Sequence, residues 1–448
     1  MNNAKHNLSS EQINEIIRQY NLINNDELKK REHGSDGYSD RDEYHRDYAR
    51  ILYSPSFRRL QGKMQIMGIK SDAFYRNRLT HSLEVAQIAR SIATLLSEAC
   101  EGGGEGEDKC KGMYKDDIYV LEAAALAHDI GHPAFGHKGE RVLNEIAKNA
   151  GMRFEGNAQN YRVLRKLEIK DPEWKGLNLT YRTLFAINKY IVSEYTGKSK
   201  FMYQDDYVFL DKIREQYGLI EQRTLDVQII EIADDIAYAV HDLEDGLALR
   251  KFNVDEILFI LKIEENKQNI QDDKKPSKKC EEIVNEARDY ADNFKGTNIQ
   301  EYSKIFRLKL TSLLTDKFVR DLTLEQVTKE KAGKHGVKVG CWELSLNSYR
   351  ELLELLKKSV FTCSTRDTDI QEYERKGEII IKTLYKIYSD STNQDAMLLP
   401  PSYRGGNNLQ ENSINYIAGM MDTFAISMFE EHTGVSFDKI DFSNKNII

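Results

Sequence analysis

The chain has 448 residues, of which 40% are hydrophobic and 30% are charged, and its formal net charge is −8 at pH 7. This length and hydrophobic content suffice to bury a large core, and no run of about 18 apolar residues is present that could span a bilayer. The negative charge excludes a general attraction for nucleic acid, so local Arg, Lys or metal charge must draw any anionic substrate.

The cysteines and the N-terminus predict a protein of the reducing cytoplasm. The first ten residues, MNNAKHNLSS, lack the basic and apolar regions of a secretory signal peptide. No pair of cysteines has the close spacing that is typical of a metal site. The five cysteines are Cys100, Cys110, Cys280, Cys341 and Cys363.

Helical patterns dominate the chain, and only six prolines interrupt them. Residues 9–30 are predicted to form a helix that Ser9 or Ser10 caps. Ser54 and Pro55 are typical of the cap and the first turn of a further helix. The N-terminal region is therefore expected to be helical, with irregular polar connections.

Two apolar helices follow, and a polar segment separates them. Residues 79–96 carry apolar side chains at helical period, which places His81 in the first turn of a buried helix. Residues 118–131 form the second apolar helix. Between them, residues 101–112 (EGGGEGEDKCKG) cannot pack a core, so we expect a mobile loop there.

The second half of the chain is predicted to be helical between two polar loops. One loop covers residues 271–279, and the other covers residues 329–340 (KEKAGKHGVKVG), which are basic and contain several glycines. We interpret residues 329–340 as a flexible solvated loop, because charge runs are usually solvated, and keep a phosphate-contacting loop as the alternative. Only short runs such as residues 378–381 are compatible with strands, so we predict an all-α fold.

Residues 128–137 (HDIGHPAFGH) combine three histidines and one carboxylate. Imidazole and carboxylate together suit a first-row divalent ion or Mg²⁺, and four such ligands leave positions open for water and a phosphate oxygen. Adjacent side chains point about 100° apart on a helix, so His128 and Asp129 can share an ion only over a helix end. A lone histidine is more often a hydrogen-bonded core residue. The predicted ligands occur as a set: His81, His128, Asp129 and Asp234.

Two further histidines and a glutamate indicate acid-base chemistry. Glu140 follows His137 by three residues, so the two share a helix face. A carboxylate beside an imidazole orients its tautomer and stabilises its charged form. His137 with Glu140 could then activate water or protonate a leaving oxygen, while His132 could contact a phosphate. The alternative is structural, with His137 at a helix cap and Glu140 in solvent.

Residues 225–243 carry a polar stripe on a predicted helix. Asp234, Tyr238 and Asp242 follow one another at intervals of four residues and therefore lie on one face. Such a stripe can hold a metal at one end and a sugar along its length. Without the metal partners, Tyr238 and Asp242 would be an ordinary helix surface.

These segments resemble the bacterial deoxyguanosine triphosphate triphosphohydrolases of the HD-domain superfamily, a group that includes the vertebrate SAM-and-HD-domain dNTP hydrolases. The resemblance runs from about residue 40 to residue 430. The matching segments are SPSFRRL at 54–60, RNRLTHSLEVAQIAR at 76–90, AHDIGHPAFGHKGE at 127–140, FEGNAQ at 154–159, ADDIAYAVHDLEDG at 233–246 and NYIAGMMDTFA at 415–425.

The resemblance implies that a dNTP and water give a deoxynucleoside and inorganic triphosphate. It implies one bound divalent ion (Mn²⁺, Mg²⁺, Ni²⁺, Co²⁺, Fe²⁺ or Zn²⁺). The implied roles are metal binding by His81, His128, Asp129 and Asp234, acid-base catalysis by His137 supported by Glu140, phosphate contact by His132, contact with the α-phosphate or base by Arg78, and contact with the deoxyribose by Gln65, Tyr238 and Asp242.

The resemblance also implies an HD-domain helical bundle with helical insertions and a mostly helical C-terminal region. We expect an N-terminal segment at residues 1–40, a catalytic core at 41–250 and a C-terminal region at 251–448 that completes the fold and is a candidate for regulation. We expect a homo-oligomer without a membrane partner. Whether a nucleotide or single-stranded DNA activates the enzyme stays open.

Two other functions fit the same residues. One is a two-metal HD phosphodiesterase or nucleotidase, in which His132 and His137 would bind a second ion. The other is a catalytically quiet nucleotide-binding regulator that keeps the helices as a scaffold. The complete set of predicted ligands disfavours it, since an inactive copy tends to lose some of them.

Overall fold

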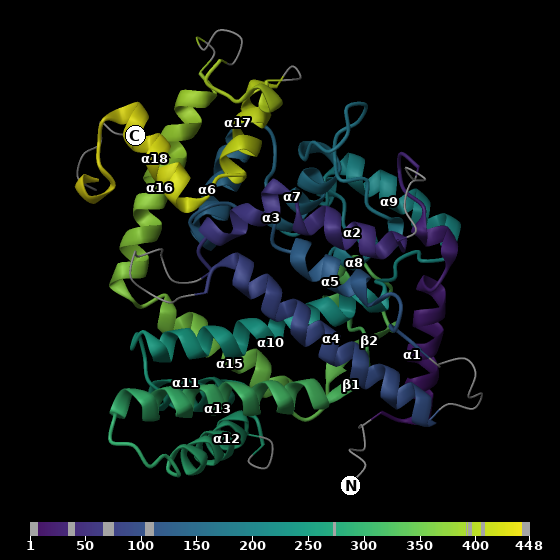
Figure 1. Cartoon of the computed structure of the whole chain (residues 1–448), viewed down its shortest axis with the longest axis vertical. Helices are drawn as coiled ribbons and strands as arrows, with labels where there is room; N and C mark the ends of the chain where they lie inside the picture. Colours follow the sequence, from purple (N-terminus) through teal and green to yellow (C-terminus); the bar gives the residue numbers. More distant parts are fainter. Residues whose placement is uncertain are drawn as a thin grey trace.

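Helices make up nearly all of the regular structure in the computed structural model (Figure 1). The all-α prediction is confirmed, although it did not include a two-stranded antiparallel sheet of β1 (Leu322–Gln326) and β2 (Trp342–Leu346). No helix within the described ranges is long and apolar enough to cross a membrane. The described residues are 8–34, 41–65, 76–103, 112–271, 275–390, 392, 397–404 and 408–440.

The N-terminal helix α1 (Ser10–Ile23) begins as predicted. The Ser9 hydroxyl accepts a hydrogen bond from the Gln12 amide, and the Gln12 side-chain oxygen accepts one from the Ser9 amide, which forms a capping box. The helix ends at Ile23, short of the predicted residue 30.

The predicted cap at Ser54 is also confirmed. Its hydroxyl accepts from the Phe57 amide at the start of α3 (Pro55–Arg59), which follows α2 (Glu43–Leu52). Here Pro55 occupies the first turn, where its missing N–H would have no helical partner.

Three helices form the centre of the molecule: α4 (Arg78–Gly103), α5 (Ile118–Ala127) and α10 (Leu225–Ala248). They pack against one another, and Figure 1 shows α4 and α10 crossing the middle of the molecule. Apart from Glu122, the side chains of α5 from Val120 to Ala127 are apolar, and all of them are buried, as expected for a helix enclosed by others.

Further helices surround this centre. Below α10 in Figure 1 lie α11 (Val254–Lys267), α12 (Pro276–Ala291), α13 (Ile299–Arg320) and α15 (Arg350–Ser364). On the other side lie α7 (Gly156–Arg162), α8 (Tyr181–Ile187) and α9 (Gln204–Tyr217).

A second hydrophobic cluster joins α6 to the C-terminal helices. Val142 and Leu143 of α6 belong to the same cluster as Ile380 and Phe429. Figure 1 shows these helices gathered together at the upper left. The helices are α6 (Gly136–Asn149), α16 (Thr368–Tyr388), α17 (Leu409–Ala418) and α18 (Asp422–Thr433).

The prediction of a flexible loop at residues 329–340 is wrong for its first half. Residues Lys329–His335 form helix α14, which the Thr328 hydroxyl caps. Ala332, His335 and Val337 are buried, so the segment packs against the protein with its apolar side chains while its lysines face outward. The pattern of charges hid this short amphipathic helix.

Three other local predictions have separate outcomes. Residues 378–381, which are compatible with a strand, lie inside helix α16. Of the loop at 101–112, residues 104–111 lie outside the described residues, and α4 continues to Gly103. Of the loop at 271–279, residues 272–274 lie outside the described residues, and α12 begins at Pro276.

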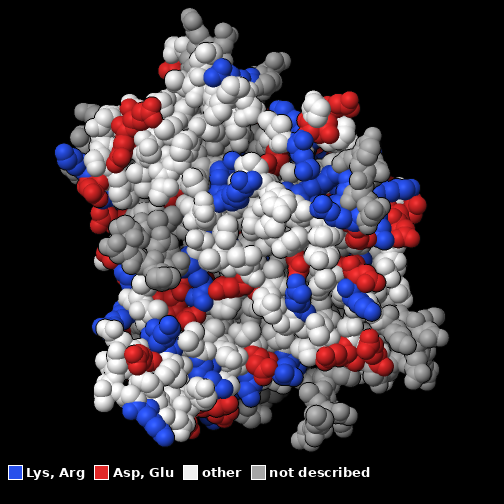
Figure 2. All heavy atoms as spheres, viewed as in Figure 1, with Lys and Arg blue, Asp and Glu red and all other residues white. Residues whose placement is uncertain are grey.

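The surface carries charges of both signs. Figure 2 shows acidic and basic side chains interspersed over the face seen in Figure 1. Such a mixture agrees with a substrate being attracted by a local site rather than by the field of the whole molecule.

Candidate active site

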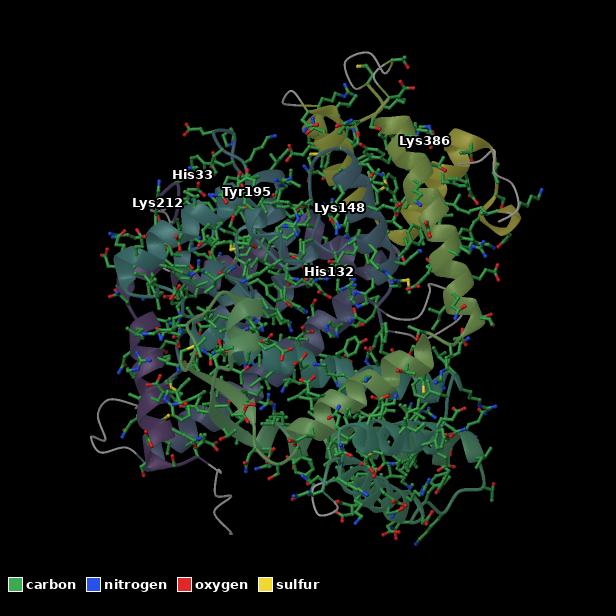
Figure 3. The ribbon with its side chains drawn as sticks, turned by 180° about the vertical axis from the view of Figure 1, so that it is seen from behind. His33, His132, Lys148, Tyr195, Lys212 and Lys386 are labelled. Atoms are coloured by element: carbon green, nitrogen blue, oxygen red, sulfur yellow. The ribbon has the colours of Figure 1, made fainter. Side chains whose placement is uncertain are left out.

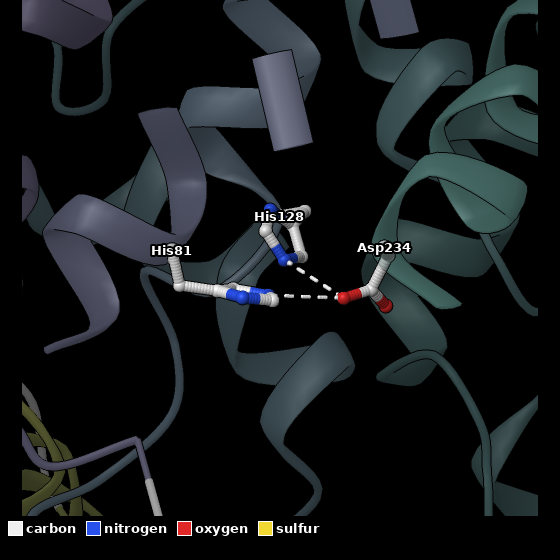
Figure 4. Close-up of side chains that lie close together, drawn as sticks. All are labelled: His81, His128 and Asp234. Carbon is white, nitrogen blue, oxygen red and sulfur yellow. Dashed lines mark hydrogen bonds and ion pairs between the residues drawn. The ribbon is translucent and has the colours of Figure 1, made fainter. Parts of the chain in front are cut away.

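Three central helices bring two histidines and one aspartate together. His81 lies in the first turn of α4, His128 directly follows α5, and Asp234 lies in the middle of α10. Asp234 Oδ1 is 3.1 Å from His81 Nε2 and 3.5 Å from His128 Nε2 (Figure 4). One ligand atom from each residue lies within 4.8 Å of the others, which is close enough for a single ion.

The orientation of His128 fits a metal ligand. Its Nδ1 donates a hydrogen bond to the Ala125 carbonyl oxygen at 2.6 Å, which leaves the Nε2 lone pair facing Asp234. This Nε2 is buried and has no hydrogen-bond partner. A backbone carbonyl on one imidazole nitrogen commonly orients the other nitrogen toward a metal.

The charges around His128 also favour a cation. Burial lowers the pKa of His128, but the carboxylates of Asp129 and Asp234 outweigh burial and raise the pKa to about 9. The pKa of Asp234 lies well below its usual range, because His128 and His81 outweigh the opposing effect of burial. The donor set therefore fits a divalent ion, for which imidazole and carboxylate are common ligands.

Asp129, the fourth predicted ligand, lies beside this group but not within it. Its Oδ1 is 3.7 Å from His128 Nε2 and 3.1 Å from His132 Nδ1. Its Oδ2 forms an ion pair with Arg78. Burial opposes ionisation of Asp129, but Arg78, His132 and His128 hold its pKa well below the usual range. Asp129 could therefore reach an ion at His128 if it exchanged its contact with Arg78.

The turn after α5 keeps its shape because α7 packs directly on it. The Asn160 amide donates to the His128 carbonyl, and its oxygen accepts from the Gly131 amide at 2.6 Å. A Cβ on Gly131 would lie 2.3 Å from the Asn160 nitrogen, and one on Gly156 would lie 3.0 Å from the His132 ring. Glycine is therefore required at Gly131, where a Cβ would overlap the backbone, and any larger residue at Gly156 would have to displace the His132 ring.

The predicted acid-base pair lies at the start of α6. His137 Nδ1 is 3.8 Å from Glu140 Oε2, and the His137 side chain is 54% exposed. Glu140 accepts from the Gly156 amide at 3.1 Å and lies 3.3 Å from Lys200 Nζ. Burial opposes ionisation of Glu140, but interactions with His137, His132 and Lys200 hold its pKa well below the usual range.

The stripe on α10 continues away from the histidines. Tyr238 lines the same cavity as Gln65 and Arg78. Asp242, one turn further along the helix, is 3% exposed and lies outside the cavity lining. Burial, together with the charge of Asp245, raises the pKa of Asp242 well above its usual range. Oδ2 of Asp242 and Oε1 of Gln65 are buried without a hydrogen-bond partner.

The cavity has a volume of about 190 Å³ and includes residues that sequence reasoning missed. Lys189 Nζ is 3.5 Å from Asp234 Oδ2 and 3.7 Å from Glu231 Oε1. Burial lowers the pKa of Lys189, but Tyr190, Glu231 and Asp234 outweigh burial and raise its pKa well above the usual range. Lys189, Tyr190 and Lys200 lie outside every segment that carried a motif, so no sequence signal indicated them, whereas Asn157 lies within the segment FEGNAQ and was not singled out. The missed lining residues are Asn157, Lys189, Tyr190, Lys200 and Glu231.

His132 marks the buried part of the cavity. In the view from behind, His132 lies within the body of the ribbon, whereas His33, Tyr195 and Lys212 lie toward its edge (Figure 3). His132 is 8% exposed. The part of the cavity at His132 is therefore buried, whereas the His137 side chain, which also lines the cavity, is more than half exposed.

Comparison with known proteins agrees with this geometry. The HD domain matches residues 78–239, and the phosphohydrolase-associated domain matches residues 347–431. Over 438 residues the chain is 40% identical to deoxyguanosinetriphosphate triphosphohydrolase-like protein 2 of Vibrio cholerae serotype O1, an alignment that covers 97% of this chain and 99% of the relative. The chain belongs to the deoxyguanosinetriphosphate triphosphohydrolase-like family of HD-domain proteins.

Other members of this family are more distant. The triphosphohydrolase-like protein of Shewanella sediminis is 31% identical, with 87% of this chain and 91% of the relative covered. That of Shewanella oneidensis is 30% identical, with 92% and 98% covered. The match to the HD domain contains the candidate ligands, the helices α4 and α5, and α10 as far as residue 239. The match to the phosphohydrolase-associated domain contains α17 and most of α18.

Proposed function

We propose that this protein is a metal-dependent hydrolase that converts deoxynucleoside triphosphates into deoxynucleosides and inorganic triphosphate. One observation carries the proposal: buried polar atoms without hydrogen-bond partners gather around one cavity. Leaving such an atom unpaired costs about 1–3 kcal/mol, so a polar ligand is expected there. The atoms are Gln65 Oε1, Arg78 Nε, His128 Nε2 and His132 Nδ1, and Asp242 Oδ2 lies one helical turn beyond the lining residue Tyr238.

His81, His128 and Asp234 would hold the metal, and Asp129 would join them on leaving Arg78. A bound divalent ion would supply Lewis acidity toward a phosphate oxygen and lower the pKa of water. Among the residues that the structure describes, this is the one group of three or more possible ligands. That count favours one ion over the two-metal alternative.

The chain's own residues would then orient the triphosphate. Arg78, once released from Asp129, offers a planar fork of donors to the α-phosphate. His132 would contact the same phosphate from the turn after α5. Lys189 and Lys200 also line the cavity, and we assign them to the outer phosphates, because they add positive charge to that of Arg78 in the same lining.

His137 would protonate the 5′-oxygen. As water adds to the α-phosphorus, the bond from phosphorus to the 5′-oxygen breaks, and the proton from His137 completes the deoxynucleoside hydroxyl. The ionised Glu140 stabilises the imidazolium form that must donate this proton. Its bonds to Gly156 and Lys200 keep its carboxylate in place.

The sugar would lie against α10. Gln65 Oε1 can accept a hydrogen bond from the 3′-hydroxyl, and Asp242, whose raised pKa favours the protonated carboxyl, can donate one to the same hydroxyl oxygen. Neither Gln65 Oε1 nor Asp242 Oδ2 has a partner without the sugar. Tyr238 would close the space beside the 2′ carbon, so a ribose would need room and partners for an added hydroxyl. Deoxynucleotides are therefore the expected substrates.

Product analysis tests the function. The protein loaded with each divalent metal in turn should release deoxynucleoside and triphosphate from dNTPs and act poorly on NTPs. Release of pyrophosphate or single phosphates, or equal action on GTP and dGTP with every metal, would overturn the proposal.

The role of His137 has its own test. His137→Ala should keep its metal yet lose about 10²–10⁴-fold in kcat, the usual range for general acid-base catalysis. His33→Ala is the control, because His33 is exposed and lies away from the site (Figure 3). Near-normal turnover by His137→Ala would remove this residue from the mechanism.

A further inference from the structure

A buried carboxylate from the C-terminal region contacts two segments that carry residues of the candidate site. Asp422 is the first residue of α18 and has no exposed surface. Its Oδ1 accepts from the Phe135 amide at 3.1 Å, and its Oδ2 accepts from the Met64 amide at 3.3 Å and from the Tyr373 hydroxyl at 3.2 Å. Asp422 therefore joins segments that are hundreds of residues apart in the chain.

The two backbone donors lie next to residues of the candidate site. Met64 directly precedes Gln65, and Phe135 precedes His137 by two residues. Phe135 has φ +61°, a left-handed conformation that is unfavourable for a non-glycine residue. Such a conformation persists only where the surroundings hold it, and one of the bonds that hold it comes from Asp422.

Lys63 makes a second link between the same parts of the molecule. It is 1% exposed, and its Nζ donates to the carbonyl oxygens of His132 at 2.5 Å and of Ala418 at 3.0 Å. Ala418 ends α17, four residues before Asp422. Hydrogen bonds of Lys63 and of Asp422 thus link the connection between α17 and α18 to the segments beside the cavity.

Close packing leaves little room for these segments to shift. A Cβ on Gly62 would lie 2.7 Å from Met421 Sδ, and a Cβ on Gly377 would lie 2.4 Å from Phe135 Cγ. The contact at Gly62 presses the α17–α18 connection against the segment that leads to Gln65. The contact at Gly377 presses α16 against the turn that leads to His137.

We propose that Asp422 is a positioning residue, which sets Gln65 on the sugar side of the cavity and His137 on the leaving-group side through the amides of Met64 and Phe135. The inference rests on the proposed function, since it uses the roles given there to Gln65 and His137. A carboxylate with a purely structural role would affect folding alone. Asp422 acts on both stability and turnover, because its hydrogen bonds end on the two segments that carry reacting-site side chains.

Asp422→Asn tests this, because it keeps the shape of the side chain but replaces one acceptor by a donor. The amide can satisfy one of the two backbone N–H groups and must face the other with its own N–H. We expect an unchanged metal content, a fall in kcat of about 10–100-fold and a higher KM for dNTP, a loss of the size found when a supporting residue of a site is removed. Asp438→Asn, at an exposed carboxylate in the same region, should behave as the wild type.

A double-mutant cycle separates positioning from stability. If Asp422 acts through His137, then Asp422→Asn should lower kcat far less in the His137→Ala background than in the wild type, because the route it supports is already lost. An equal fold-loss in both backgrounds, or no loss in the wild type, would overturn the inference. If Asp422→Asn does not fold, Tyr373→Phe removes one donor to the same carboxylate and should give a smaller loss, about threefold, that likewise vanishes in the His137→Ala background.

The cycle also keeps the two proposals apart. If the wild type cleaves a different phosphate ester and no dNTP, the proposed function fails, and the same cycle is measured with that ester. If dNTPs are cleaved but the fold-losses in kcat of Asp422→Asn and His137→Ala multiply in the double variant, only the positioning role of Asp422 fails.

Discussion

Helix α10 carries two buried aspartates whose surroundings differ sharply. Asp226, in its first turn, accepts from the Tyr114 hydroxyl at 2.7 Å and from Arg182 Nε at 2.9 Å, so both of its oxygens are paired. Asp242, four turns later, is nearly as buried, yet its Oδ2 has no partner. Asp234 lies between them and meets His81 and His128.

The difference separates a structural carboxylate from one that fits a ligand. Burying a carboxylate is costly unless hydrogen bonds or opposite charges compensate. Arg182 and Tyr114 compensate Asp226 within the protein, so this residue needs nothing further. Oδ2 of Asp242 has no such partner within the protein, so this residue suits a polar ligand such as the proposed 3′-hydroxyl. Four predictions sharpen this contrast along the helix.

The largest effect is expected at Asp234. Asp234→Ala should lose both the metal and at least about 10³-fold in activity, since a metal supplies several kcal/mol of transition-state stabilisation. Metal content by mass spectrometry and dNTP turnover measure the two losses. Asp235→Ala is the matched control, because Asp235 pairs with Lys357 on α15 and should keep the metal. Metal retained by Asp234→Ala would refute the ligand set.

A large effect on stability is expected at Asp226. Asp226→Asn leaves Arg182 with one carboxylate fewer and should lower the free energy of unfolding by about 3 kcal/mol, the range for breaking a buried ion pair. Urea denaturation measures this loss, and kcat of the folded protein should stay near the wild-type value. A large fall in kcat with normal stability would place Asp226 in the site instead.

A smaller effect on specificity is expected at Tyr238. Tyr238→Ala should narrow the preference for dGTP over GTP by about 10–100-fold in kcat/KM, equivalent to about 1–3 kcal/mol. Tyr238→Phe is the control, because it keeps the ring that would exclude the 2′-hydroxyl. A loss of rate that is equal for both nucleotides would leave the tyrosine a structural role.

The smallest effect is expected at Asp242, where a substitution should raise the free energy of unfolding, whereas the one at Asp226 should lower it. Burial raises the pKa of Asp242, so the folded state holds this proton more tightly than the unfolded chain does. The wild type therefore loses stability as the pH rises above about 4, toward the raised pKa. Asp242→Asn does not titrate, so in the ligand-free protein it should become the more stable variant by about 1 kcal/mol at neutral pH. Thermal unfolding from pH 4 to pH 8 measures the difference, and destabilisation as large as that of Asp226→Asn would contradict the contrast.

The sequence by itself determined the local features of this protein. The caps at Ser9 and Ser54 and the buried first turn that carries His81 are confirmed. The helix predicted for residues 118–131 begins at Ile118 as expected but ends at Ala127, four residues before the predicted end at Gly131. These features depend on neighbours within a few residues, because helical hydrogen bonds and side-chain faces repeat over three to four positions.

Only the tertiary structure decided which distant residues share the cavity. Lys189 and Lys200 come from irregular segments, and Asp422 arrives from a helix nearly three hundred residues after the HD motif. The pairing of Asp129 with Arg78 and the burial of α14 were equally hidden. The physical reason is that a local pattern fixes a face of a helix but not its partner, which the packing of the whole core selects.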